Sequence, residues 1–123
     1  MNVTFKNVEG LGRAIARGDA TVIAATMMAI NDVVLDIAAR ADDLVPFDTG
    51  VLSGSQKIEN ATFSNLTATI GYGGPAAPYA LVQHEDPDYQ HSAGRVYKYL
   101  EAPARQVGKG VGKRIVGLVN KAL

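Results

Sequence analysis

Apolar residues recur at alternating intervals of four and three between positions 19 and 44. The members of this series are Ile23, Met27, Ile30, Val34, Ile37, Ala41 and Leu44. That spacing places them on one stripe of an α-helix, and such a stripe normally faces the core. Asp19 precedes the series and is a good N-cap, because its carboxylate can accept from free N–H groups of the first turn. We therefore expect one long helix, with Asp36 and Arg40 spaced for an i,i+4 ion pair.

Two shorter patterns precede this helix. Asn2 to Lys6 alternates between apolar and polar residues and predicts a short edge strand. Val8, Leu11 and Ile15 have helical spacing, which predicts one or two helical turns within residues 7–17. We expect Gly18 to end that segment.

The period changes to two after the long helix. Residues 56–63 have moderate strand character, and Ser64-Asn65 is typical of a turn. Leu66, Ala68, Ile70 and Tyr72 then alternate with polar or small residues, so residues 56–72 predict an antiparallel hairpin. Residues 79–84 fit either a third strand or a short helix, and the polar residues 85–95 predict an exposed loop.

The last segment, residues 96–123, predicts a second helix that begins near Glu101 or Ala102, with Pro103 in its first turn. Its expected apolar face consists of Val107, Val111, Ile115, Leu118 and Ala122. Arg105, Lys109 and Lys113 are four apart on another face. Four glycines weaken this helix by about 1 kcal/mol each, so it should depend on packing. The predicted fold is an α+β domain covering residues 1–123, with an antiparallel sheet of about three to five strands against two long helices.

Composition restricts the chemistry. The 123 residues include no cysteine, which excludes a disulfide scaffold, a zinc-thiolate site and a thiol nucleophile. The first residues lack a signal-peptide pattern, and we expect no apolar run long enough to cross a membrane, so the expected setting is a reducing cytoplasm. Net charge is zero, but seven basic residues and one acidic residue follow position 93. That polarity suits head-to-tail contact between copies or contact with an anionic partner, and it equally suits a solvated basic helix face.

Three candidate sites remain open to other interpretations. Asp48-Thr49-Gly50 is also the triplet of dimeric aspartic proteases, but that fold is nearly all β, and here a long helix ends just before the motif. A dense group of potential ligands follows later in the chain: His84, Glu85, Asp86, Asp88 and His91. Their spacing matches no common metal motif, which favours a solvated loop, and no cofactor is expected. The basic, glycine-rich residues 108–114 lack a complete phosphate-loop pattern and interleaved aromatics, so nucleic-acid binding is a weaker hypothesis.

The order of the motifs resembles the small neck proteins of tailed bacteriophages, variously called tail completion, head–tail joining or minor tail proteins. An alanine-rich helix end at residues 36–41 is followed by the pattern P-x-D-T-G-x-L-x-x-S, formed by Pro46, Asp48, Thr49, Gly50, Leu52 and Ser55. A hairpin ending in Ile-Gly-Tyr-Gly (70–73), the segment Tyr-Ala-Leu-Val (79–82) with His84-Glu85, and Lys-Tyr-Leu-Glu-Ala-Pro-Ala (98–104) then follow in order. The resemblance covers nearly all of the chain after about Val8, but residues 86–95 match no family pattern.

The resemblance implies a non-enzymatic virion protein, assembled in the host cytoplasm as a ring of about six identical subunits between head connector and tail tube. The Asp-Thr-Gly motif is then structural, and DNA meets the protein only by passing through the ring lumen. Expected contacts with neighbouring subunits or neck proteins are His84, Glu85, Asp86, Asp88, His91, Arg95, Arg105, Lys109 and Lys113. The alternatives are a head-closure or minor capsid protein and, in another class, a dimeric aspartic protease using Asp48.

Overall fold

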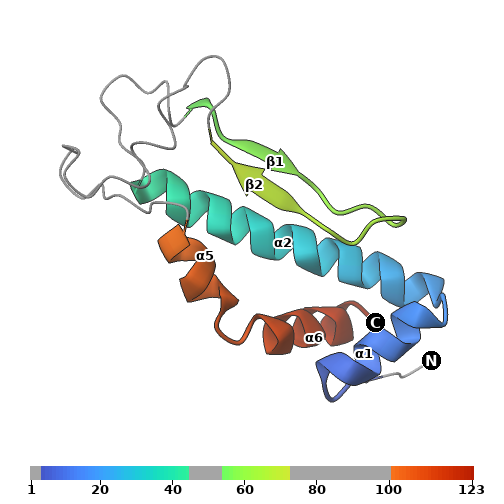
Figure 1. Ribbon diagram of the computed structural model, residues 1–123. Helices are drawn as coiled ribbons and strands as arrows, with labels where there is room; N and C mark the ends of the chain where they lie inside the picture. Colours follow the sequence, from blue (N-terminus) through green and yellow to red (C-terminus); the bar gives the residue numbers. More distant parts are fainter. Residues whose placement is uncertain (1–3, 45–53, 73–100) are drawn as a thin grey trace.

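The computed structural model describes residues 4–44, 54–72 and 101–123 (Figure 1). Its helices and strands are α1 (Val8–Ala16), α2 (Ala20–Leu44), β1 (Lys57–Glu59), β2 (Thr69–Gly71), α5 (Glu101–Gly108) and α6 (Val111–Ala122). The described residues are therefore mostly helical, with one small antiparallel sheet.

The starts of α1 and α2 are set by side-chain caps. Asn7 Oδ1 accepts from the Gly10 N–H at 2.9 Å, and Asp19 Oδ1 accepts from the Val22 N–H at 3.2 Å. Gly18, between the two helices, has a φ of 76°, a left-handed conformation that glycine adopts without steric cost. The predicted helical turns, the break at Gly18 and the cap at Asp19 are confirmed.

Helix α2 is packed on two sides, by the β1–β2 hairpin on one and by α1, α5 and α6 on the other (Figure 1). Its buried band is therefore wider than the predicted stripe. Ile23, Val34 and Ala41 are buried as expected, whereas the stripe's other members, Met27, Ile30, Ile37 and Leu44, are only partly buried. The remaining buried positions are Val22, Ala25, Thr26, Ala29, Val33 and Ala38.

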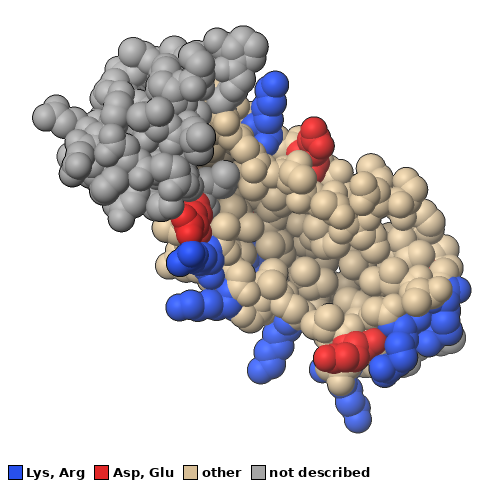
Figure 2. Space-filling model, viewed as in Figure 1, with Lys and Arg blue, Asp and Glu red and all other residues tan. Residues whose placement is uncertain are grey.

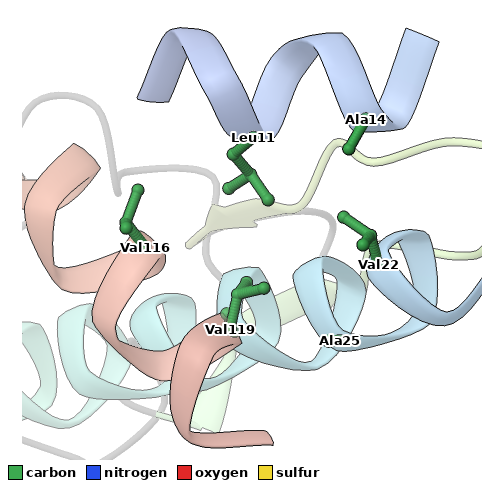
Figure 3. Close-up of a cluster of buried hydrophobic side chains, with 7 residues drawn as sticks. Leu11, Ala14, Val22, Ala25, Val116 and Val119 are labelled. Atoms are coloured by element: carbon green, nitrogen blue, oxygen red, sulfur yellow. The ribbon is translucent and has the colours of Figure 1, made fainter. Parts of the chain in front are cut away.

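A cluster of buried hydrophobic side chains forms the core between α1, α2 and α6 (Figure 3). It consists of Leu11, Ala14, Val22, Ala25, Ala29, Val116 and Val119. Alanines on α2 allow α6 to approach closely, so that Val119 is completely buried. Gly112 has a similar role towards α1, because a Cβ atom there would lie only 2.7 Å from Val8 Cγ2.

The predicted hairpin is confirmed, with Ile58 opposite Ile70 and an isolated bridge between Thr62 and Asn65 at its tip. Asn31 fastens it to α2: its amide donates to the Ala61 carbonyl at 3.1 Å, and its oxygen accepts from the Ala61 N–H at 2.7 Å. The described sheet has two strands, fewer than the three to five expected. Residues 79–84, the third candidate strand, lie outside the described residues.

The predicted N-terminal strand is wrong for its described residues. Thr4 and Phe5 belong to no strand. Instead, the Phe5 N–H donates to Asn120 Oδ1 at 2.7 Å and its carbonyl accepts from Asn120 Nδ2 at 2.8 Å. The Asn120 side chain of α6 thus bonds the two backbone groups of Phe5 that a neighbouring strand would otherwise pair.

The predicted start of the C-terminal helical region at Glu101 is confirmed, but its continuity as one helix is not, since α5 ends at Gly108 and α6 begins at Val111. Gly110 has a φ of 70°, which interrupts the helix. Residues after the break therefore do not continue the helical faces of α5. Val107 is buried as predicted, but beyond the break Val116 and Val119 are buried while Ala122 is exposed. The predicted apolar face, which assumed one continuous helix through Gly110, therefore no longer faces the core at Ala122 in the last turn.

Helix α2 is long and apolar enough to cross a membrane by length and composition, contrary to our expectation; it has 25 residues and a mean hydropathy of 1.8 in its most apolar window. Core helices of water-soluble proteins meet the same criterion. The packing of α2 against the hairpin and three helices accounts for its apolar character.

Candidate functional site

Most predicted motif and loop residues lie outside the described residues. This applies to Pro46, Asp48, Thr49, Gly50, Leu52, His84, Glu85, Asp86, Asp88, His91 and Arg95. Ser55, the last motif residue, is described and buried just before β1. Within the described residues, no three His, Cys, Asp or Glu side chains are grouped so that they could hold a metal ion.

The three predicted basic contacts are all exposed. Arg105 pairs with Glu101 at 2.5 Å between Nη2 and Oε1, one turn earlier on α5. The break at Gly110 separates Arg105 and Lys109 from Lys113, so the three do not follow one continuous helical row. Figure 2 shows Lys and Arg side chains projecting into solvent on the side of the molecule formed by α1, α5 and α6.

An ion-pair network centred on Asp36 connects three helices. Asp36 Oδ2 accepts from Arg114 Nη1 of α6 at 2.7 Å, and Asp36 Oδ1 accepts from Arg40 Nε at 2.9 Å. Arg40 Nη1 also donates to Gln106 Oε1 of α5 at 3.1 Å. The predicted Asp36–Arg40 pair is thus confirmed, within a larger network that fixes α5 and α6 against α2.

The two arginines change the acid–base behaviour of Asp36. Hydrogen bonds from Arg114 and then Arg40 hold the pKa of the Asp36 carboxyl below its usual value of 3.8. Burial acts in the opposite direction and is outweighed. The carboxylate is therefore ionised throughout the neutral range, and its role is structural cross-linking of helices.

A groove opens on the surface where α2 and α6 meet. It is lined by Ala25, Met28, Ala29, Asp32, Leu118 and Ala122, and these residues define the α2–α6 groove. Its volume is about 240 Å³, and among the described residues that line it Asp32 alone is ionisable. Met28 is 64% exposed at its edge, and Leu35, two turns along α2, is 56% exposed.

A second exposed apolar feature lies at the hairpin tip, which we define as residues 61–66. Phe63 is 52% exposed there, beside the Thr62–Asn65 bridge that closes the turn. Sequence reasoning missed both features. The groove depends on the contact between α2 and α6, while Phe63 was assigned to the hairpin without regard to the face it occupies.

No protein-family model, curated protein or solved structure matches this chain.

Proposed function

We propose that the chain is a non-enzymatic structural subunit of a tailed-bacteriophage neck, forming a ring that completes the tail and joins it to the head connector. The observation that carries this proposal is the ordered motif set. The pattern P-x-D-T-G-x-L-x-x-S separates the long helix from the hairpin, and Glu101-Ala102-Pro103 opens the last helical region. The described elements α2, β1–β2 and α5–α6 follow in the order that this resemblance requires.

The surface chemistry supports an assembly role. The region from Glu101 to Leu123 carries five basic residues and one acidic residue. Lys109 and Lys113 are exposed, and Met28, Leu35 and Phe63 expose large apolar side chains. Copies that contact each other through two different surfaces form a ring when the rotation between them closes.

Native mass spectrometry tests the proposal. The purified protein is measured over a range of concentrations, with and without phage tail tubes. A discrete ring, or a ring that appears only with tubes, is the expected result and gives the subunit number. A protein that stays monomeric in the presence of tubes and is absent from assembled virions would contradict it.

A head-closure or minor capsid protein is the neighbouring alternative. The two roles differ in which assembly intermediate retains the protein. A neck subunit that completes the tail should purify with finished tails, whereas a head-closure protein should remain on DNA-filled heads that lack tails.

A dimeric aspartic protease is the alternative from another class, and the Asp48-Thr49-Gly50 triplet is the observation that favours it. Asp48→Asn would abolish cleavage by such an enzyme, because the shared dyad needs both carboxyl groups. Under the neck proposal the wild-type protein does not cleave peptides, and the same substitution leaves ring assembly intact.

A further inference from the structure

We propose that Phe63 at the hairpin tip of one copy inserts into the α2–α6 groove of a second copy. The inference deepens the proposed function and rests on it, because it assigns the two surfaces that neighbouring subunits use. The contact is heterologous, since the hairpin tip and the groove are different surfaces of the same chain.

The two features match in size and chemistry. An apolar cavity of about 150 Å³ is sufficient to hold benzene, and the groove has about 240 Å³. Five of its six lining residues are alanine, leucine or methionine. Residues 60–68 contain no ionisable side chain, so insertion of the tip brings no charge into the groove.

The groove also offers a polar partner. Asp32, whose side chain is 59% exposed, lies 3.9 Å from Arg114 and has acceptor capacity left. Ser64 and Asn65, beside Phe63, carry hydroxyl and amide donors. A tip that places the phenyl ring among the alanines can therefore donate to Asp32 at the edge of the groove.

The tip cannot reach the groove of its own chain. Asn31 holds Ala61 of the hairpin, while its neighbour Asp32 lines the groove. Adjacent residues point about 100° apart around a helix. The hairpin and α6 also lie on opposite sides of α2 (Figure 1). Phe63 can therefore enter an α2–α6 groove only on another copy.

Cross-linking tests the contact directly, because the natural chain has no cysteine. Ser64→Cys and Met28→Cys are made in separate chains, which are mixed and mildly oxidised under the conditions that give rings. A disulfide-linked pair of one chain of each kind is expected. Lys57→Cys on β1, mixed with Met28→Cys, is the matched control and should give little product.

Assembly measurements supply the second test. Phe63→Ala should raise the concentration needed for half-assembly at least about tenfold, as for other aromatic side chains buried at interfaces. Met28→Asp should have a similar effect through the groove. The exposed Asn60→Ala is the control, and thermal unfolding checks that each variant is folded.

The possible outcomes separate this contact from the proposed function. Rings that form without the Ser64–Met28 cross-link, or that tolerate both Phe63→Ala and Met28→Asp, overturn the contact and leave the neck proposal in place. The contact is also overturned if Phe63→Ala weakens assembly but Met28→Asp does not, because the Phe63 side chain would then insert at a site other than the groove. A protein that remains monomeric even with tail tubes contradicts both.

Discussion

Two asparagine side chains each connect parts of the chain that are distant in sequence, and we call these two connections clasps. Asn31 bonds both backbone groups of Ala61, and Asn120 bonds both backbone groups of Phe5. A side-chain amide, with donors and an acceptor, reproduces the pairing that a neighbouring strand would give. Each clasp therefore satisfies backbone groups where the described residues provide no adjoining strand.

We predict that Asn31→Ala lowers the free energy of unfolding by about 2 kcal/mol. Ala61 is buried, so its N–H and carbonyl lose their partners in an environment that water enters poorly. Chemical denaturation measures the change. Asn60→Ala is the control, because Asn60 is exposed and should change stability by less than about 0.5 kcal/mol. Equal effects of the two substitutions would show that the clasp contributes nothing specific.

The second residue-scale prediction concerns acid. Because the pKa of Asp36 is lower in the folded protein than its ordinary value of 3.8, its stabilising contribution is fully present above that value. The contribution is lost as the pH falls through the lower, folded-state pKa. Asp36→Asn should therefore cost about 1 kcal/mol at neutral pH and reduce the acid sensitivity of unfolding.

Asp32→Asn is the matched control for this network. Asp32 also faces Arg114, but the distance is 3.9 Å and the side chain is 59% exposed, so its contribution should be smaller. Urea denaturation of the three proteins between neutral pH and about pH 3 gives the comparison. A larger loss for Asp32→Asn than for Asp36→Asn would refute the assigned order of the two carboxylates.

At the scale of elements, the sequence predicts best what neighbouring residues determine. The cap at Asp19, the break at Gly18, the Asp36–Arg40 pair and the hairpin all depend on residues close in sequence. The Arg114–Asp36 bond joins residues 78 positions apart, and no local pattern indicates it. The predicted row of Arg105, Lys109 and Lys113 assumed one continuous helix, and Gly110 breaks that continuity.

The break at Gly110 between α5 and α6, which we call the α5–α6 elbow, gives a prediction at the scale of elements. Gly110→Ala should destabilise the protein by about 1 kcal/mol, because a φ of 70° is unfavourable for a residue with a Cβ atom. Gly117→Ala should stabilise it by up to about 1 kcal/mol, since Gly117 lies within α6 and a Cβ there meets no atom within 4 Å. Thermal unfolding of both variants decides the matter: stabilisation by Gly110→Ala would mean that α5 and α6 readily join into one helix.

At the scale of the whole molecule, the exposed apolar features and the exposed lysines of α5–α6 lie in different places within the described residues. The hairpin tip has no ionisable side chain and the lining of the α2–α6 groove includes the carboxylate of Asp32, whereas the exposed basic side chains of Lys109 and Lys113 lie at the α5–α6 elbow and on α6. Apolar insertion is little affected by salt, but attraction between exposed charges is screened within about 10 Å at 0.1 M and about 3 Å at 1 M. The two kinds of contact can therefore be distinguished in an assembling protein.

We predict that ring assembly weakens as salt increases and that Lys109 and Lys113 cause much of this dependence. Lys109→Glu combined with Lys113→Glu should raise the half-assembly concentration about tenfold at low salt, since it reverses two charges that would attract the acidic excess of residues 1–93 in a neighbouring copy. The difference from the natural protein should shrink in about 1 M salt. Lys57→Glu, on exposed strand β1, is the control for a charge change outside the basic segment. Native mass spectrometry or sedimentation over a salt series measures the effect. If the half-assembly concentration changes neither with salt nor with the double substitution, these lysines form only a solvated helix face. Subunit contact would then depend on apolar surfaces.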